Sequence, residues 1–277
     1  MNQTLNQATP EATEKLHIAV VGGGPGGYAA AFLAADLGMQ VTLIDPELNP
    51  GGVCLYRGCI PSKALLHVAK LIEESRQAKN WGIEFPAPTI DLARLRTWKE
   101  GVVKKLTGGL GQLSKQRHLE YIQGRAAFEN STTLRISKTD SSEAVLSFDR
   151  VIIATGSRPA ILPALKLDSP RMMDSSGALN LEDIPGSLLV VGGGYIGLEL
   201  GSVYAALGTR VTVVEMLPGL LPGADRDLVL PLHKRLEKMF EAILLNTTVA
   251  SLKEDGAGIR ASFQGSAVAE KDREKVF

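Results

Sequence analysis

Residues 17–45 read HIAVVGGGPGGYAAAFLAADLGMQVTLID, and this stretch indicates an α/β fold. An apolar strand leads into a G-x-G-x-x-G turn made by Gly22, Gly24 and Gly27. An alanine-rich helix follows, and a second β-branched strand ends on Asp45. The three glycines permit a tight turn, a close approach of the backbone to a pyrophosphate, and close helix–strand packing. Because the N–H groups at the helix start then face the phosphates, the stretch predicts a dinucleotide-binding unit.

The same pattern occurs a second time, 170 residues further along the chain. LLVVGGGYIGLELGSVYAALGTRVTVVE (188–215) has its glycines at Gly192, Gly194 and Gly197 and its terminal acid at Glu215. In both copies the acid follows the last glycine by 18 residues, which suits a ribose hydroxyl pair. Two matching copies predict two dinucleotides, and the alternative is a duplicated α/β unit that keeps its shape without a ligand. No arginine directly follows Glu215, which favours NAD over NADP because a carboxylate repels a 2′-phosphate.

Length and composition predict a soluble globular protein of about two domains. The chain has 277 residues, of which 44 % are hydrophobic and 22 % are charged. Lys+Arg and Asp+Glu balance at 30 each, so charge gives no support for a nucleic-acid or anionic-membrane partner. We expect the first of these domains over residues 16–157 and the second over residues 158–277, each with one copy of the glycine motif.

The first fifteen residues, MNQTLNQATPEATEK, predict a disordered tail over residues 1–15. They lack a basic start followed by an apolar run, which disfavours a secretory signal. They contain no arginine and carry Glu11 and Glu14, which disfavours a mitochondrial transit peptide. The longest small-apolar stretch, residues 28–38, is too short to span a bilayer. The expected location is therefore cytoplasmic.

Both cysteines of the chain lie in the short segment GGVCLYRGCIPSK (51–63), as Cys54 and Cys59. In a reducing compartment such a pair is more often catalytic or metal-binding than a structural staple. A zinc site needs four ligands, and the chain's four histidines are scattered without paired spacing. The sequence therefore favours a redox disulfide and predicts no metal site.

Geometry indicates that the helix around the cysteines is distorted. Two residues at i and i+5 on a regular helix lie roughly 8.7 Å apart between Cα atoms, whereas disulfides seldom bridge more than about 7 Å. Gly58 stands directly before Cys59 and supplies backbone freedom. Nicotinamide passes a hydride and a dithiol exchanges two electrons, so a flavin is the natural relay between them.

Four segments resemble those of the flavin-dependent pyridine nucleotide–disulfide oxidoreductases. They are GGVCLYRGCIPSKALLH (51–67), TWKEGVVKKLTGGL (97–110), VIIATGSRP (151–159) and VVGGGYIGLELGSVYAALGTRVTVVE (190–215). The C-x4-C-I-P-S-K segment is highly specific, and the resemblance covers the chain from Leu16 onward. Within the family, the resemblance is strongest to the members that oxidise dihydrolipoamide with NAD⁺, because glutathione and mercuric reductases typically vary the C-x4-C-I-P-S-K segment.

The resemblance implies FAD and NAD as cofactors and assigns a role to each matching position. The first glycine motif would hold the adenosine half of FAD, and the second motif with Glu215 would hold NAD, with Val249 near its adenine. Implied FAD contacts outside the glycines of the first motif are Asp45, Gly52, Cys54, Lys63, Gly124, Thr155, Gly156 and Ser157. Cys59 would lie against the flavin as the charge-transfer thiolate, and Cys54 would exchange with the dithiol. Lys63 would lie near flavin N5 as a buried lysine paired with Glu199.

The family's catalytic base is not found among these residues. The resemblance implies a histidine, oriented by a glutamate, in a C-terminal dimerisation domain supplied by the partner subunit. His233 and Glu237 are i,i+4 on an expected helix, which predicts a solvated face. Only 80 residues follow Gly197 (277 − 197), and the chain stops about where the family begins the strand that closes its NAD domain. We therefore expect a truncated chain without that dimerisation domain, inactive alone, with apolar surface exposed where the FAD-domain sheet lacks a strand.

Two functions remain open at this point. The first is a dihydrolipoamide-oxidising flavoenzyme that acts on the lipoyl domain of a 2-oxo acid dehydrogenase complex and is a homodimer at full length. The second is a short dinucleotide-binding redox or regulatory module without turnover, or another disulfide reductase of the same family.

Overall fold

The computed structural model describes residues 15–160, 162–256, 258–265, 268, 270 and 273–277. The chain forms two compact α/β units. Unit 1 contains the described residues up to Gly52 together with Thr107–Gly156, and unit 2 contains Val53–Leu106 and Ser157–Phe277. The predicted fold class is confirmed. The expected tail lies almost wholly outside the described residues, and the expected domain boundaries stay predictions.

Unit 1 is built on a six-stranded sheet with the strand order β5-β4-β3-β2-β1-β6. Its elements are β1 (His17–Val21), α1 (Pro25–Asp36), β2 (Gln40–Asp45), β3 (Glu120–Asn130), β4 (Thr133–Lys138), β5 (Glu143–Ser147) and β6 (Arg150–Ile153). Strand β1 runs parallel to both β2 and β6, and β2 runs parallel to β3. The pairs β3–β4 and β4–β5 are antiparallel. The turn at Gly22 therefore lies at the carboxyl ends of parallel strands, where open α/β sheets bind their ligands.

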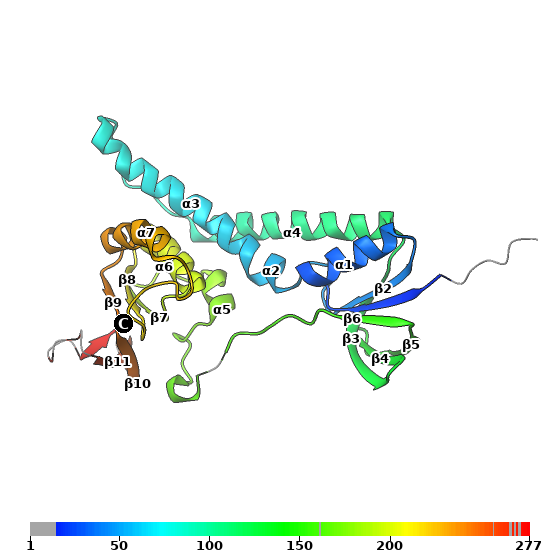
Figure 1. Ribbon diagram of the computed structural model, residues 1–277. Helices are drawn as coiled ribbons and strands as arrows, with labels where there is room; N and C mark the ends of the chain where they lie inside the picture. Colours follow the sequence, from blue (N-terminus) through cyan, green and yellow to red (C-terminus); the bar gives the residue numbers. More distant parts are fainter. Residues whose placement is uncertain (1–14, 161, 257, 266–267, 269, 271–272) are drawn as a thin grey trace, which may run out of the picture. The chain divides into compact units, whose positions relative to one another are not determined.

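Apolar residues cover both faces of this sheet, as a parallel sheet requires. Ile18 and Val20 of β1 pack with Ala31 and Ala34 of α1, which lies along one face (Figure 1). Ala19, between Ile18 and Val20, belongs to the cluster on the other face. Because successive side chains of a strand point to opposite faces, this short apolar run is buried on both sides.

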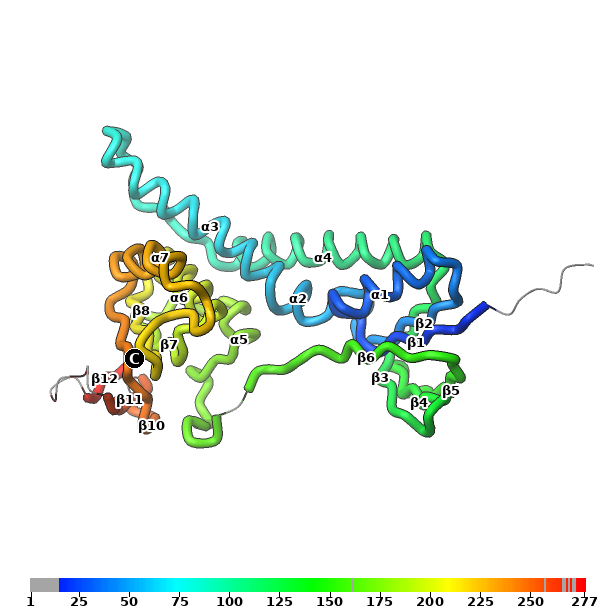
Figure 2. Tube along the Cα trace, viewed as in Figure 1, coloured from blue at the N-terminus to red at the C-terminus, as the bar shows by residue number. Residues whose placement is uncertain are grey.

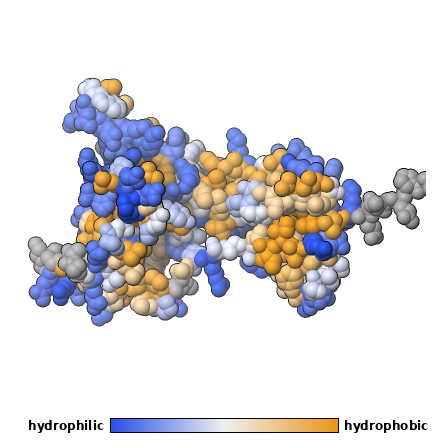
Figure 3. Space-filling view, viewed as in Figure 1, coloured by the Kyte–Doolittle hydropathy of each residue, from blue (hydrophilic) through white to orange (hydrophobic). Residues whose placement is uncertain are grey.

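One edge of the unit 1 sheet is apolar and exposed. Strand β6 pairs only with β1 among the described residues. Its Ile152 and Ile153 are both exposed, Ile153 to 64 %. Figure 3 shows apolar side chains on this part of the surface. Two isoleucines of this edge strand are thus exposed in the structure.

Unit 2 contains the second copy of the strand–turn–helix pattern. Its elements are α3 (Cys59–Gln77), η1 (Ala78–Trp81), η2 (Pro163–Leu165), α5 (Ser175–Asn180), β7 (Ser187–Val191), α6 (Tyr195–Leu207), β8 (Arg210–Val214), α7 (Arg226–Met239), β9 (Ala242–Leu244), β10 (Thr247–Asp255), β11 (Gly258–Gly265) and β12 (Glu274–Val276). Strands β7, β8 and β9 form a parallel sheet in that order. Strands β10, β11 and β12 form an antiparallel meander, in which β12 lies beside β11 (Figure 2).

The largest apolar core of the protein lies in unit 2, around α6. It joins α6 to α3 through Leu65 and Ala69, and to α7 through Leu236. A smaller cluster, with Phe263 and Val214, packs the meander against β8. The packing of α3 on α6 explains why Val53–Leu106 belongs to unit 2 rather than to the unit that precedes it in sequence.

The helix is interrupted between the two cysteines, as the disulfide geometry predicted. Helix α2 (Gly52–Arg57) begins at the last residue of the first part of unit 1, and α3 begins at Cys59. Gly58 between them has φ −147° and ψ −114°. A Cβ at Gly58 would approach the Val53 carbonyl oxygen to 2.9 Å. Gly58 therefore allows α2 and α3 to meet closely.

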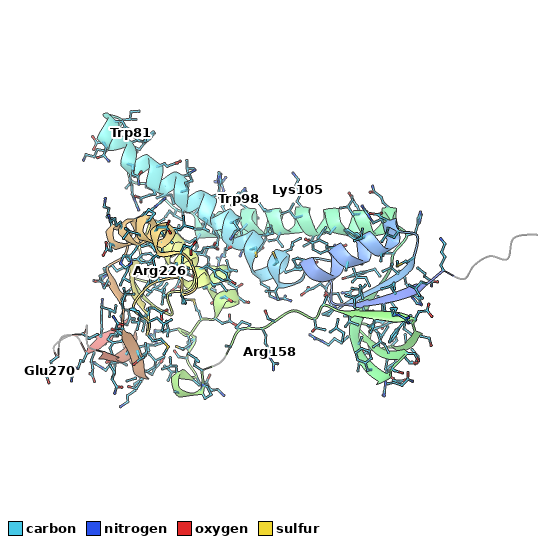
Figure 4. The ribbon with its side chains drawn as sticks, in the orientation of Figure 1. Trp81, Trp98, Lys105, Arg158, Arg226 and Glu270 are labelled. Atoms are coloured by element: carbon cyan, nitrogen blue, oxygen red, sulfur yellow. The ribbon has the colours of Figure 1, made fainter. Side chains whose placement is uncertain are left out.

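Helix α4 (Leu92–Gln116) contributes residues to both units. It contains the segment 97–110, whose Trp98 and Lys105 are labelled in Figure 4. In the described part of the chain, no helix is long and apolar enough to cross a membrane.

Candidate dinucleotide sites and cysteine pair

The first glycine motif forms a tight backbone turn at the end of β1. Gly22 has φ +104°, a conformation that favours glycine, and its N–H donates to the Ile44 carbonyl (2.8 Å). A Cβ at Gly22 would collide with the Ala154 carbonyl of the chain that leaves β6. A Cβ at Gly27 would collide with the Gly22 carbonyl. The backbone contacts in this turn therefore exclude any larger side chain at two of the three motif glycines.

Asp45, at the end of β2, stabilises this turn through hydrogen bonds. One carboxylate oxygen accepts a hydrogen bond from the Gly23 N–H (2.6 Å), and the other accepts from the Glu47 N–H (2.9 Å). A Cβ at Gly23 would lie 3.0 Å from the Asp45 Cβ, so the absence of a side chain at Gly23 lets the Asp45 carboxylate approach the backbone of the turn. Each oxygen keeps a second lone pair, which leaves Asp45 able to accept from a ribose hydroxyl.

Two further predicted residues lie beside the same turn within unit 1. The Gly51 N–H donates to the Gly23 carbonyl (2.7 Å), and a Cβ at Gly52 would collide with the backbone of Gly24. The Thr155 nitrogen lies 3.1 Å from the position of a Cβ at Gly22. Gly156, which has φ +71°, follows directly. The structure thus brings Gly52 and Thr155 to the turn that the sequence singled out.

The second glycine motif repeats the first almost bond for bond. The Gly192 N–H donates to the Val214 carbonyl (2.8 Å), and Gly192 has φ +106°. One Glu215 oxygen accepts from the Gly193 N–H (2.7 Å), and the other accepts from the Leu217 N–H (2.8 Å). A Cβ at Gly197 would lie 2.8 Å from the Gly192 carbonyl oxygen. Glu215 therefore occupies in unit 2 the position that Asp45 occupies in unit 1.

Both helix starts fit a phosphate. Gly24 caps the start of α1 and Gly194 caps the start of α6, and neither helix start has a side-chain capping bond. Both helices are long enough to carry a substantial dipole, at 12 and 13 residues. No acidic side chain lies in either first turn. The N–H groups of the first turn are thus available to an anion at both motifs.

The cysteine pair holds two thiols next to each other across the helix break. Both cysteines are free in this structure, Cys54 half-buried and Cys59 exposed. Burial, together with a hydrogen bond to Cys59 and the charge of Cys59, raises the pKa of the Cys54 thiol to about 11, although the Lys63 ammonium opposes the shift. Cys54 therefore holds its proton at neutral pH.

Lys63 and Glu199 form the ion pair that the resemblance implied. The Lys63 Nζ lies 2.9 Å and 3.0 Å from the two oxygens of Glu199 on α6. The hydrogen bond from Lys63 to Glu199 raises the pKa of Lys63 despite some desolvation. The Lys63 side chain is 58 % exposed, so the expectation of a buried lysine is not met in this structure. The charge pair is a solvent-facing contact between α3 and α6.

Three predicted positions lie away from the glycine turns. Gly124 is in β3, and a Cβ there would lie 2.8 Å from the Ser137 carbonyl oxygen of β4, which gives this glycine a packing reason. Val249 is in β10 and packs against the cluster under the meander. Ser157 begins the second part of unit 2. Their cofactor roles stay predictions.

The histidines contribute no acid–base pair of the expected kind. His233 and Glu237 lie 3.4 Å apart on α7, where Glu237 is largely exposed and His233 is half-buried. The His17 ring bonds the Thr42 hydroxyl (2.8 Å) beside the sheet. Among the described residues, no group of three metal-ligating side chains is brought together.

Sequence reasoning missed two kinds of residue that the site uses. Gly23 and Gly193 donate the N–H groups that hold the acids, and the repeated GGG triplet was the signal that could have found them. Ser62 is buried and bonds Glu199, and its place beside Lys63 was the only hint in the sequence.

A sequence model of the pyridine nucleotide-disulphide oxidoreductase family matches residues 16–276. The chain belongs to this family.

Curated relatives agree with one another in their names. The chain is 47 % identical over 253 residues to a dihydrolipoyl dehydrogenase of Haemophilus influenzae, covering 91 % of this chain and 53 % of the relative. It is 44 % identical over 260 residues to the dihydrolipoyl dehydrogenase of Vibrio cholerae, covering 94 % of this chain and 54 % of the relative. The chain thus spans about half the length of the curated relatives it matches.

Solved structures give the same fold. A crystal structure of LpdA from Mycobacterium tuberculosis matches with a TM-score of 0.82 at 28 % identity, over 94 % of this chain and 56 % of that one. The HOCl-induced flavoprotein disulfide reductase RclA from Escherichia coli matches with a TM-score of 0.75 at 27 % identity, over 94 % of this chain and 54 % of that one.

Proposed function

We propose that this chain supplies the dinucleotide-binding and dithiol-exchanging part of a flavin-dependent dihydrolipoyl dehydrogenase. The observation that carries the proposal is the cysteine pair, held across a helix break and followed by the Lys63–Glu199 ion pair. Relatives that are 44–47 % identical support the choice of dihydrolipoamide as the dithiol.

The residues at the two glycine turns suit FAD and NAD. The N–H groups at the start of α1, with Asp45, Gly52 and Thr155, would hold FAD. The N–H groups at the start of α6, with Glu215, would hold NAD. Arg226, labelled in Figure 4, donates to the carbonyls of Leu220, Leu221 and Ala224, so it is already engaged in the loop after β8. Because this arginine is not free to bind a 2′-phosphate, the arrangement favours NAD over NADP. When bound, FAD would supply the relay of an electron pair between the dithiol and the nicotinamide.

The cysteines would exchange with the dithiol in two displacements. A substrate thiolate attacks Cys54 Sγ, the Cys54–Cys59 bond breaks, and Cys59 leaves as a thiolate. The second substrate thiol attacks the resulting mixed disulfide, Cys54 leaves, and the cyclic disulfide product is released. Of the two protons of the dithiol, one goes to Cys54, whose raised pKa favours the thiol, and one goes to an external base. The electron pair then resides on the cysteines.

The external base is proposed to come from outside this chain, in a full-length homodimer. None of the four histidines in the sequence has the expected motif, and the carboxylate that His233 contacts, Glu237, is its neighbour one turn along the same helix. The chain alone would then show no sustained turnover. The lipoyl domain of a 2-oxo acid dehydrogenase complex would be the natural partner of the whole enzyme.

Lipoamide-dependent NADH oxidation by the chain, supplied with FAD, tests the proposed absence of the base. We expect no steady turnover, and steady turnover would show that the base lies within these residues. Partial reduction of the FAD-loaded chain tests the cysteine assignment separately. A long-wavelength charge-transfer absorbance should appear, and Cys59→Ser should abolish it while Cys54→Ser should not. Survival of the band in Cys59→Ser would contradict the assignment of the flavin-proximal thiol.

The alternative is a dinucleotide-binding redox or regulatory module without turnover, or a reductase for another disulfide. A binding module needs no cysteine pair, which favours the first proposal. Single-turnover reduction of the oxidised cysteine pair, compared between dihydrolipoamide and glutathione, separates these alternatives without sustained turnover. Faster reduction by glutathione would favour a reductase for another disulfide, and no reduction by either thiol would favour a module without dithiol exchange.

A further inference from the structure

Ser62 lies in the first turn of α3, three residues after Cys59. Its N–H donates to the Gly58 carbonyl (3.0 Å), which fixes this turn directly after the helix break. Its residue surface is only 6 % exposed. A buried hydroxyl needs a partner, and the partners of Ser62 show what the residue does.

The Ser62 hydroxyl has two acceptors on different elements. Its Oγ lies 3.1 Å from the Cys59 carbonyl oxygen of the same turn. It also lies 3.2 Å from Oε2 of Glu199 on α6. Because a hydroxyl has one proton and a carboxylate is the stronger acceptor, the bond to Glu199 is the one that fixes the rotamer.

Glu199 is shared between Ser62 and Lys63, which are neighbours in sequence. The same Oε2 that accepts from Ser62 lies 3.0 Å from the Lys63 Nζ, and Oε1 lies 2.9 Å from it. Lys63 follows Cys59 by four residues, so both lie on one face of α3. The buried Ser62 bond thus anchors an ion pair whose lysine is otherwise solvent-facing.

We propose that Ser62 is a positioning residue that holds Glu199 and, through it, keeps the Lys63 ammonium beside the Cys54–Cys59 pair so that the thiolate form is favoured. The charged and titratable groups that act on the pair are Cys54 and Cys59 themselves, Lys63 on α3 and, through Lys63, Glu199 on α6. Both cysteines interact electrostatically with Lys63. The inference deepens the proposed function at the same cysteine pair.

The rate of alkylation of the reduced chain by iodoacetamide tests this proposal without flavin or dithiol substrate. The rate is measured for each cysteine by peptide mass spectrometry across a pH series. Ser62→Val and Ser62→Thr have nearly the same volume and differ in the hydroxyl. We expect Ser62→Val to slow alkylation of the pair about two- to fivefold near neutral pH, because an exposed charge contact has a modest effect. Ser62→Thr should behave as the unchanged protein.

Ser75→Ala is the matched control on the same helix. The Ser75 hydroxyl makes the same kind of bond to the carbonyl three residues earlier (Ile72, 2.7 Å), and no carboxylate contact accompanies it in the described structure. We expect no change in thiol reactivity for this variant. An equal slowing in Ser75→Ala and Ser62→Val would overturn the proposal, because both would then act through the helix alone.

A double-mutant cycle with Lys63→Met tests the route of the effect. In the Lys63→Met background, Ser62→Val should have no further effect on the alkylation rate. A full effect there would contradict the role of Lys63 and assign Ser62 to the Cys59 backbone instead. If circular dichroism shows that Ser62→Val does not fold, Ser62→Ala replaces it in every comparison. Failure of the proposed function would appear in the charge-transfer and turnover experiments, whereas failure of this inference appears in alkylation.

Discussion

The two copies of the strand–turn–helix pattern have the same local bonds but different neighbours. In unit 1, β1 lies between β2 and β6, and the chain leaving β6 packs against Gly22. In unit 2, β7 pairs with β8 alone among the described residues, and no neighbouring atom lies within 4 Å of a Cβ built at Gly192. The hydrogen bonds of the turn and its acid are nevertheless matched. The turn is therefore set by local sequence, whereas its packing is set by what the rest of the chain places beside it.

The helices of the two copies also differ in packing, but here it is the copy in unit 2 that is packed more closely. Helix α1 buries only small residues, Gly27, Ala31 and Ala34. Helix α6 buries larger residues such as Leu198, Leu207 and Tyr204, because α3, α5 and α7 pack around it. Hydrogen exchange read by peptide mass spectrometry reports the stability of each unit by itself, and the comparison can be tested with paired substitutions.

The largest difference is expected between Gly22→Ala and Gly192→Ala. Both positions have a positive φ, so both variants pay a backbone strain of about 1–3 kcal/mol. Gly22→Ala also drives a methyl group into the Ala154 carbonyl, so we expect a loss of about 4 kcal/mol in unit 1. Gly192→Ala should lower the stability of unit 2 by about 2 kcal/mol. Equal losses would contradict the difference in packing around the two turns.

Asp45→Ala and Glu215→Ala should have equal effects. Each variant leaves the N–H of a motif glycine, Gly23 or Gly193, without its carboxylate acceptor. We expect each to destabilise its own unit by about 2 kcal/mol, the cost of an unsatisfied buried donor. Exchange rates of the glycine-turn peptides measure this. If only one of the two variants destabilised its unit, the two acids would not have the same structural role.

Tyr204→Phe should have a smaller effect, confined to unit 2. The residue 170 positions earlier is Ala34, whereas the Tyr204 hydroxyl donates to the Ala178 carbonyl (2.9 Å) inside the α6 core. Loss of this bond should cost about 1 kcal/mol at neutral pH. Phenylalanine keeps the ring and its packing, so a loss several times larger would indicate a role beyond the hydrogen bond.

The same variant makes a pH prediction. Burial raises the pKa of Tyr204 to about 12, with Asp183 and Glu182 adding to the shift. A raised pKa in an acid means that the folded state keeps its proton longer than the unfolded state. Stability is therefore complete below the unfolded value near 10 and is lost as pH rises towards 12, by about 1 kcal/mol at pH 11. Denaturant unfolding between pH 9 and pH 11.5 should show this fall, and Tyr204→Phe should lack it.

The smallest effect is expected for Glu241→Gln, which tests how the meander attaches to the parallel sheet. In unit 1 the hairpin β3–β4–β5 continues the main sheet, whereas in unit 2 the meander is a separate sheet. The Lys275 Nζ on β12 reaches Glu241 beside β9 at 2.6 Å. The hydrogen bond from Lys275 lowers the pKa of Glu241, so this contribution is present above about pH 4.5 and is lost as pH falls further.

Because both side chains are about a third exposed, the loss in Glu241→Gln should stay below about 0.5 kcal/mol. Hydrogen exchange in β12 at pH 7 and at pH 4 measures it. A loss above about 2 kcal/mol would show that the ion pair, rather than the apolar cluster around Phe263, holds the meander in place.

The sequence allowed prediction of the local features of both copies, because glycine spacing and apolar runs are local signals. It located the two turns, the acids at the ends of β2 and β8, and the helix break at Gly58. It could not predict that Val53–Leu106 joins unit 2, since that depends on which helix packs on α6. It also missed the bond between Ser62 and Glu199, because contacts between residues 137 positions apart leave no local pattern.

The central claim is that Cys54 and Cys59 exchange two electrons with a dihydrolipoamide-type dithiol. The most direct measurement equilibrates the chain with graded ratios of reduced and oxidised lipoamide, alkylates the remaining thiols, and weighs the intact protein. We expect only two populations of the chain, one with both cysteines alkylated and one with neither. The balance between them should follow the lipoamide ratio. Cys59→Ser should show no such transition. Two alkylated cysteines at every ratio, or a disulfide between chains in place of one within the chain, would contradict the account.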